Sequence, residues 1–327
     1  MATLSQGLHA ACGNHSDVRI IRGLPQRADA PVALTIGNFD GVHRGHEAML
    51  ARLVEAAEDL RLVPTVLTFD PHPREFFAPG RSPARISSRR DKLARLAAAG
   101  VARTIVARFD ARLAATSPQS FIDDVLVARL ATRWLLVGGD FHFGKGRAGD
   151  LSFLRQAART FSVEAMATVE AEGERVSSTA VRAALARGDL AHAAAMLGRP
   201  FTIAGRVTHG DKRGRALGVP TANLALPGGA AVSGIFAVRV HGIDDGPRPG
   251  VASVGVRPTI APGGRPLAEV FILDFDAPIY GRRIEIEFLH KLRDEARFDT
   301  LDALARQMHT DVAQARDWFS THASMTQ

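Results

Sequence analysis

The sequence predicts an α/β domain with a parallel sheet, followed by a small antiparallel β-barrel with a C-terminal helix. From residue 31 to about 187, apolar runs of strand length alternate with helix-period segments, which is typical of repeated βαβ units. After residue 200 the apolar runs are short, rich in β-forming residues and separated by Gly/Pro turns. The length of 327 residues is also that of about two domains.

The first part contains five expected strands, each a short apolar run. They are Val32–Ile36, Val63–Phe69, Thr104–Ala107, Trp134–Val137 and Val163–Thr168. Between them, leucine and alanine recur at three- and four-residue spacing, which predicts helices over Glu47–Leu60, Arg89–Ala99, Pro118–Leu130 and Leu151–Thr160. Because open parallel sheets bind ligands at the carboxyl ends of their strands, we expect a site where glycine-rich and polar segments follow these strands.

The second part is predicted to be a barrel of short antiparallel strands. These are Phe201–Val207, Ile235–Val240, Val251–Val254, Glu269–Phe275 and Ile284–Leu289, followed by an amphipathic helix over Leu301–Phe319. The helical stretch Asp189–Leu197 and the tripeptide Gly198-Arg199-Pro200 separate the two parts. We therefore expect domains at 17–187 and 201–325, joined by a linker at 188–200, with a disordered tail over the stretch to about Asn14.

The composition is that of a globular protein. Hydrophobic residues make up 46%, charged residues 23%, and the mean hydropathy is zero, which excludes disordered, collagen-like and coiled-coil chains. No apolar run approaches the roughly 18–20 residues that span a bilayer, and the N-terminus lacks a secretory signal pattern. The single cysteine, Cys12, excludes intrachain disulfides and sites built on several thiolates. These features predict a cytoplasmic protein with no membrane association.

The positive charge raises nucleic acid as a partner. Residues 1–200 hold 26 Lys and Arg against 20 Asp and Glu, whereas residues 201–327 hold 15 against 14. The isoelectric point is about 10.5. However, the arginines are scattered and aromatic residues, which stack on bases, are only 6%. We therefore favour anionic small molecules and expect no nucleic acid, while a nucleic-acid-binding protein is the alternative from another functional class.

The strongest local motif is the segment from Thr35 to His46, TIGNFDGVHRGH. A buried strand ends, glycines allow a tight turn, and a helix begins with His43 and His46 on one side of its first turn. Gly45 leaves room for a ligand. A helix N-terminus with two imidazolium donors would stabilise the negative charge of a pyrophosphate leaving group. The alternative is a strand–helix turn with two surface histidines; zinc is disfavoured because no third ligand is near.

The glycine-rich segment after the fourth strand contains two misleading matches. Gly139–Lys145 fits the first seven positions of a Walker A loop, but Gly146 stands where Ser or Thr should bind magnesium. Gly144–Gly149 spells GxGxxG, yet it does not directly follow a strand. We reject both, and an ordinary glycine-rich surface turn is the alternative here.

Three further segments carry polar groups. Ser177-Ser178-Thr179 precedes an apolar helix and is typical of an N-cap, with the fork of Arg182 in the first turns of that helix. Thr221 and Asn223 are two residues apart, so their neutral oxygens point the same way in an extended chain and suit magnesium beside phosphate. Glu269 is a candidate general base. Structural caps, a polar turn and a solvated carboxylate are the respective alternatives.

These segments, in this order, resemble the bacterial bifunctional riboflavin kinase/FAD synthetase family over residues 31–320. The resemblance implies a Rossmann-like nucleotidyltransferase domain followed by a riboflavin kinase barrel. It implies that the barrel converts riboflavin and ATP to FMN and ADP, and that the first domain joins FMN to a second ATP, giving FAD and pyrophosphate. Magnesium is implied as the cofactor and ATP as co-substrate. A chain with only one of the two activities is the alternative within this family, and a homo-oligomer is left open.

The resemblance also implies residue roles. The implied catalytic residues are His43, His46, Arg182 and Glu269, and the implied magnesium ligands are Thr221 and Asn223. The implied substrate and nucleotide contacts are Gly37, Phe39, Asp40, Gly45, Asp70, His72, Asp140, Phe143, Arg147, Ser178, Thr179, Gly205, Gly210, Lys212, Gly214, Arg215, Gly218, Pro220, Arg293 and Arg297. One departure is Val219, where the family commonly has phenylalanine.

Overall fold

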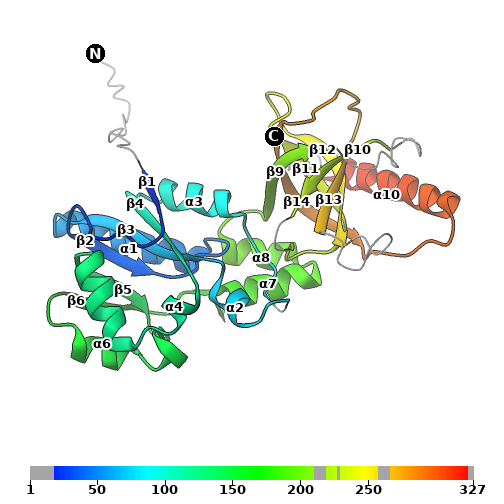
Figure 1. The fold of residues 1–327 in the computed structure, drawn as a ribbon. Helices are drawn as coiled ribbons and strands as arrows, with labels where there is room; N and C mark the ends of the chain where they lie inside the picture. Colours follow the sequence, from blue (N-terminus) through cyan, green and yellow to red (C-terminus); the bar gives the residue numbers. More distant parts are fainter. Residues whose placement is uncertain (1–17, 81, 210–218, 227–228, 257–265, 323–327) are drawn as a thin grey trace, which may run out of the picture.

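The computed structural model describes residues 18–80, 82–209, 219–226, 229–256 and 266–322, arranged in two parts (Figure 1). A six-stranded parallel sheet in the order β1-β4-β3-β2-β5-β6 forms the first part. The strands are β1 (Arg19–Arg22), β2 (Val32–Ile36), β3 (Val63–Asp70), β4 (Arg103–Arg108), β5 (Thr132–Gly138) and β6 (Ser162–Met166). The five predicted strands are present, and each of their ends agrees within two residues. Strand β1 was not predicted, because its sequence RIIR holds only two apolar residues.

Helices follow the strands of this sheet, and the last two of them pack into the buried cluster of the barrel. They are α1 (Arg44–Asp59), α2 (Pro73–Phe77), α3 (Arg89–Ala98), α4 (Ala111–Ala114), α5 (Pro118–Ser120), α6 (Leu151–Ala157), α7 (Ser178–Arg187) and α8 (Leu190–Leu197). The helix predicted over Pro118–Leu130 exists, but after α5 it continues as the π-helix η1 (Phe121–Arg129). Strand β2 is buried along its whole length, as expected for a central parallel strand covered on both faces.

The second part is a closed antiparallel barrel with strand order β10-β13-β12-β11-β14-β9. The strands are β9 (Thr202–Thr208), β10 (Thr221–Ala225), β11 (Gly234–His241), β12 (Arg248–Val256), β13 (Pro266–Ile272) and β14 (Arg283–Arg293). Helix α10 (Leu301–Thr321) packs on β11, β12 and β14 through a small apolar cluster that includes Ala237 and Ala315. The predicted fold class, a parallel α/β domain followed by an antiparallel barrel with a C-terminal helix, is confirmed.

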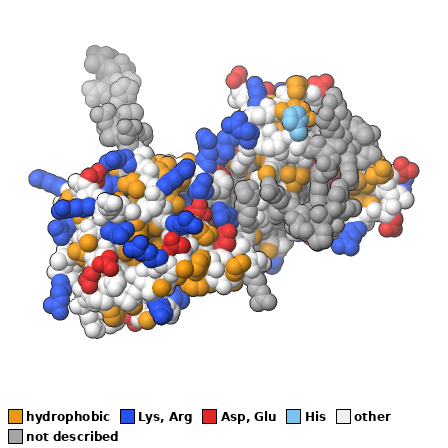
Figure 2. Space-filling view, in the orientation of Figure 1, with side chains coloured by type: hydrophobic (Ala, Val, Ile, Leu, Met, Phe, Trp, Pro, Cys, Tyr) orange, Lys and Arg blue, Asp and Glu red, His pale blue; other side chains and the backbone are white. Residues whose placement is uncertain are grey.

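The two parts are in contact through a shared core. Val181 and Leu185 of α7 and Met196 of α8 belong to the same buried cluster as Phe236 and other barrel residues. Helix α8 occupies most of the expected linker 188–200. None of the helices within the described ranges is long and apolar enough to cross a membrane. On the face shown in Figure 2, basic side chains are scattered over the first part rather than gathered into one stripe.

Candidate functional site

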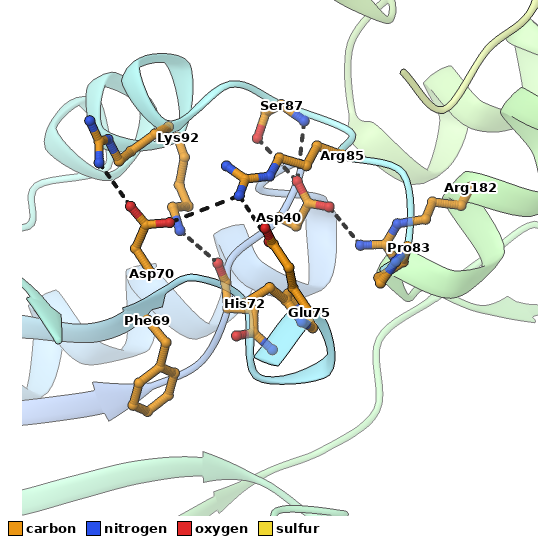
Figure 3. A pocket seen from close by; sticks show the side chains of 12 residues that line it. Asp40, Phe69, Asp70, His72, Glu75, Pro83, Arg85, Ser87, Lys92 and Arg182 are labelled. Carbon is orange, nitrogen blue, oxygen red and sulfur yellow. Dashed lines mark hydrogen bonds and ion pairs between the residues drawn. The ribbon is translucent and has the colours of Figure 1, made fainter. Parts of the chain in front are cut away.

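A pocket of about 510 Å³, counting its open mouth, lies at the carboxyl ends of β2 and β3, where the sheet topology predicts a ligand site (Figure 3). It is lined by Asn38, Asp40, Phe69, Asp70, His72, Glu75, Pro83, Arg85, Ser87, Arg89, Lys92 and Arg182. Of the residues singled out from the sequence, the pocket brings together Asp40, Asp70, His72 and Arg182. The two motif histidines follow Asp40 at the start of α1, but they are not among the residues that line the pocket.

The turn between β2 and α1 has an unusual backbone. Gly41 has φ +83°, and the non-glycine residues Phe39 and Val42 also have positive φ, at 49° and 41°. Both are almost fully buried, so packing holds them in this conformation. A Cβ at Gly41 would lie 2.8 Å from the side chain of Ile86, and one at Gly37 would lie 3.0 Å from the Phe39 ring. Strained backbone that the surroundings hold in place is concentrated at functional sites.

His43 and His46 form a stacked pair at the start of α1. Their ring centroids are 3.7 Å apart, and the His46 ring also contacts Phe39 at 4.8 Å. His43 caps the helix, because its Nδ1 accepts the backbone N–H of His46 at 3.3 Å. A neutral His43 must therefore carry its proton on Nε2, which is the donor it can offer to a ligand. A Cβ at Gly45 would lie 3.3 Å from the His43 ring, so a side chain there would crowd this pair.

The protonation of this pair differs from the expectation. Burial lowers the pKa of His43 to about 4. Burial, and then the neighbouring His43, lower the pKa of His46 well below its ordinary value. These lowered pKa values favour neutral rings near pH 7, which differs from the imidazolium donors expected from the sequence. The physical reason is that burial disfavours the charged form of each ring, and a charge on His43 would further disfavour one on His46.

The pKa of His43 predicts an acid-sensitive stability. The unfolded chain takes up a proton near pH 6.5 and the folded ring only near pH 4, so the unfolded state binds more protons between these values. The free energy of unfolding should therefore fall as the pH drops from 6.5 to about 4. Urea titrations at pH 7 and pH 5 check this, with His43→Asn as the comparison because asparagine also accepts a helix N-cap bond. An equal loss of stability in both proteins would contradict the assignment.

Arg182 and Asp40 form the polar centre of the pocket (Figure 3). The Arg182 Nη2 donates to Asp40 Oδ2 at 2.6 Å, its Nε to the carbonyl of Ala84 at 2.7 Å, and its Nη1 to the carbonyl of Ser178 at 3.1 Å. Asp40 also accepts the backbone N–H of Ile86 at 3.2 Å. The hydroxyl of Ser178 donates to the Asp40 carbonyl at 2.9 Å. In this state the guanidinium is held by the protein, so contact with a phosphate requires exchange of these partners.

Lys92 is a pocket residue that the sequence reasoning missed. Its Nζ donates to the carbonyl of Asn38 at 3.2 Å and to the hydroxyl of Thr68 at 3.1 Å, so it joins the ends of β2 and β3. Burial lowers the pKa of Lys92. The only signal in the sequence was that lysine is rare in this arginine-rich chain. Beside it, Arg89 donates to Asp70 at 2.8 Å, and the pocket has basic groups on several sides.

An aromatic cluster borders the pocket and was also missed. Phe69, which lines the pocket, meets Phe109 edge to face at 5.7 Å, and Phe109 meets both Phe76 and Phe77. Phe77 is 67% exposed, the largest exposure among the exposed large hydrophobic side chains of the described residues. An exposed aromatic ring beside a polar pocket offers a flat apolar surface to a ligand.

The loop after β5 lies outside the lining of this pocket. Phe143 is buried against Phe121, Phe141 and Phe153. Asp140 is exposed and pairs with Arg175 at 2.7 Å, which lowers the pKa of the Asp140 carboxyl. Arg147 is exposed. The ligand contacts expected of Asp140, Phe143 and Arg147 thus remain predictions. Thr179 lies in the first turn of α7 beside the Ser177 cap.

The barrel places a second group of polar residues side by side. Asn223 on β10 is directly opposite Glu269 on β13, and Glu269 is directly opposite Ser253 on β12. Directly opposite residues in antiparallel strands have Cβ atoms about 4.5–5.5 Å apart on one face of the sheet. Thr221 shares that face because it is two residues from Asn223. Strand β10 was not among the predicted strands, and Glu269 lies within β13 rather than at its start.

Asn223 has a buried oxygen with no hydrogen-bond partner within the described residues. Its Nδ2 donates to the Thr221 carbonyl at 3.3 Å, which leaves Oδ1 unsatisfied. A buried, unpaired amide oxygen lowers the stability of a protein unless a ligand binds to it, and magnesium binds such oxygens. Across the described ranges, no group of three His, Cys, Asp or Glu residues could hold a metal ion. The neutral oxygens of Thr221 and Asn223 fit a magnesium ion that phosphates also bind.

The other residues predicted as barrel contacts lie in different surroundings, and their ligand roles stay predictions. Arg293 donates through two nitrogens to the buried Asp311 at 2.7 and 2.6 Å, so its fork holds α10 against β14. Arg297 and Pro220 are exposed, and Gly205 packs against Leu224. Five predicted contacts lie outside the described residues: Gly210, Lys212, Gly214, Arg215 and Gly218.

Comparison with known proteins matches both parts of the chain. A family model described as FAD synthetase covers residues 25–180, and one described as riboflavin kinase covers residues 197–319. A bifunctional riboflavin kinase/FMN adenylyltransferase of Escherichia coli (strain K12) is 46% identical over 308 residues, which is 92% of this chain and 98% of that protein. The chain belongs to the bifunctional riboflavin kinase/FMN adenylyltransferase family.

A further relative and a solved structure also match most of the chain. The bifunctional riboflavin kinase/FMN adenylyltransferase of Pseudomonas fluorescens is 49% identical over 285 residues, covering 86% of this chain and 91% of that protein. A solved structure described as a macrolide-efflux protein from Streptococcus pneumoniae has a TM-score of 0.75 and 28% identity, covering 91% of this chain and 99% of that one. Membership of the bifunctional riboflavin kinase/FMN adenylyltransferase family accounts for two separate polar sites in one chain. One is the pocket at β2 and β3, and the other is the row of polar residues formed by Asn223 on β10 and Glu269 on β13.

Proposed function

We propose that this chain makes FAD from riboflavin in two successive ATP-dependent reactions. The barrel transfers the γ-phosphoryl group of ATP to riboflavin and releases ADP, and the parallel-sheet domain joins FMN to the adenylyl group of a second ATP and releases pyrophosphate. The observation that carries the proposal is that the region matched as FAD synthetase and the region matched as riboflavin kinase each hold a polar site of their own.

In the barrel, Glu269 is the proposed general base. Its carboxylate accepts the proton of the ribityl 5′-hydroxyl while that oxygen bonds to the γ-phosphorus and the bond to ADP breaks. Thr221 and Asn223 would hold magnesium, whose charge neutralises the phosphate oxygens. The support is the register, which sets Asn223 directly opposite Glu269, and the unsatisfied Asn223 Oδ1. This register supports a base beside the proposed magnesium ligands on one face of the sheet.

In the parallel-sheet domain, an oxygen of the FMN phosphate attacks the α-phosphorus and the bond to pyrophosphate breaks. His43 and His46 donate ring N–H groups to the leaving pyrophosphate, as neutral imidazoles in the starting state. Arg182 exchanges Asp40 for a phosphate, and Lys92 adds positive charge at the ends of β2 and β3. The Phe77 ring provides an apolar surface for the flavin ring. Neither reaction needs a covalent enzyme intermediate, so positioning and charge neutralisation supply the catalysis.

Incubation with riboflavin, ATP and magnesium, followed by chromatography of the flavins, tests both activities. FMN should appear first and FAD later, and chelation of magnesium should stop both products. Formation of FMN without FAD would identify a single-activity kinase. The absence of both flavins would refute the proposal. Nucleic-acid binding that weakens steeply with salt, in a protein with no flavin turnover, would instead favour the nucleic-acid alternative.

A further inference from the structure

We propose that Arg199, in the segment between α8 and β9, is a positioning residue for adenylyl transfer. Its guanidinium fixes the strained turn that carries His43 and His46, although Arg199 itself does not line the pocket. The proposal rests on the proposed function of those histidines. It assigns a role in the first reaction to a residue at the entrance to the second domain.

The contacts of Arg199 are with backbone oxygens of that turn. Its Nη1 donates to the carbonyl of Val42 at 2.9 Å and to that of Leu197 at 2.8 Å, and its Nη2 donates to the carbonyl of Gly41. The same Nη1 lies 3.7 Å from the carboxylate of Glu47, in the first turn of α1. A turn between a strand and a helix has no ladder partners for its carbonyls, so this one guanidinium satisfies two of them.

The turn needs external support because it is strained. Gly41 and Val42 both have positive φ, and for Val42, a β-branched residue, this is a rare conformation. Such a backbone persists only where the surroundings hold it. The next residue is His43, which caps α1 and stacks on His46. Release of the Gly41 and Val42 carbonyls would therefore move both rings relative to the pocket.

The shape of the side chain matters as well as its charge. Burial lowers the pKa of Arg199 to about 10, so the group is still protonated at neutral pH. Its planar fork reaches the two turn carbonyls from different nitrogens, which the single ammonium of lysine cannot reproduce. A lysine at this position would keep the charge but not the geometry.

The barrel fixes the position of Arg199. Two residues later, Phe201 is buried, its ring contacts that of Phe288 at 5.3 Å, and its carbonyl accepts the backbone N–H of Phe288 at 3.0 Å. The segment is therefore anchored by α8 on one side and by β14 on the other. Correct folding of the kinase barrel thus supports the geometry of the transferase histidines.

Full-length Arg199→Ala and Arg199→Lys test this proposal, with Arg282→Ala as the matched control. Arg282 is likewise an arginine that donates to a backbone carbonyl of a loop, that of Ile243 at 2.6 Å, but it lies in the barrel. FAD formation from FMN and FMN formation from riboflavin are measured on the same preparation.

We expect kcat for FAD formation to fall about 10²-fold in both Arg199 variants, as for other small displacements of reacting groups. KM for FMN and the rate of riboflavin phosphorylation should change little. Added methylguanidinium should restore FAD formation in Arg199→Ala.

Amide hydrogen exchange gives a readout that does not depend on activity. Exchange in residues 41–46 should be faster in Arg199→Ala than in the wild type and unchanged in Arg282→Ala. A parallel loss of both activities together with folded protein would assign Arg199 a purely structural role and overturn the proposal. Full FAD formation by Arg199→Lys would also overturn it. If the wild type makes no FAD, the proposed function fails, while the exchange data still decide whether Arg199 holds the turn.

Discussion

Replacement of His46 by alanine is expected to lower the rate of FAD formation by about 10²–10³-fold, the usual cost of removing a donor that stabilises developing charge. The variant should still phosphorylate riboflavin, because His46 lies in the parallel-sheet domain and contacts Phe39 and His43. The measurement is the rate of FAD formation from FMN and ATP beside the rate of FMN formation from riboflavin and ATP. His46→Gln keeps a side-chain N–H donor and should retain more activity than His46→Ala.

His192→Ala is the matched control for this substitution. His192 lies on α8 and pairs with Glu172 at 3.2 Å and with Glu174 at 2.8 Å, outside the lining of the pocket. FAD formation should persist in this variant. Loss of both activities in a folded His46→Ala protein would show that the two sites are not independent. Normal FAD formation in that variant would remove His46 from the leaving-group site.

The second large effect is expected at Glu269. Glu269→Gln should lower riboflavin phosphorylation by about 10²–10⁴-fold, because glutamine keeps the shape of the side chain but cannot accept the ribityl proton. The same protein should convert supplied FMN to FAD at the wild-type rate, since the pocket at β2 and β3 is untouched. Flavin chromatography with riboflavin and with FMN as separate starting materials measures both.

Asp274→Asn controls for the loss of a carboxylate near the same strand. Asp274 follows β13, is exposed and pairs with Arg316 at 2.6 Å. Its replacement should leave both reactions close to normal. Wild-type FMN production by Glu269→Gln would rule out Glu269 as the base, and the row formed with Asn223 would then serve only to bind the nucleotide.

Much of the fold follows from local patterns. Val32–Ile36 was predicted with its observed ends because a mostly apolar run, bounded by Pro31 and Gly37, is typical of a strand buried on both faces. Thr221–Ala225 was not predicted as a strand, since its alternating threonine and asparagine give a weak apolar signal directly after a proline. The edge strand Arg19–Arg22 was missed for a similar reason: two apolar residues are too few to show a period.

The same distinction between local and long-range signals applies to the site residues. His43 and His46 could be found because strand, glycine turn and helix start lie within one short segment. Lys92 and Arg199 could not, because each donates to a backbone carbonyl far away in sequence, 54 and 157 residues apart respectively. Carbonyl partners leave no residue-type signature. The neutral state of the histidines also depends on burial, which spacing does not reveal.

The hydrophobic cluster shared by α7, α8 and the barrel bears on how the chain unfolds. Because Leu185, Met196 and Phe236 belong to one buried cluster, opening the barrel exposes apolar surface on the helices beside the transferase pocket. The two catalytic halves should therefore melt together as one cooperative unit rather than in separate steps. A substitution that weakens this cluster would lower the cellular amounts of the kinase and the transferase activity in the same proportion. A changed ratio of the two activities would therefore indicate an effect on catalysis at one site, whereas an equal fall in both would indicate an effect on stability.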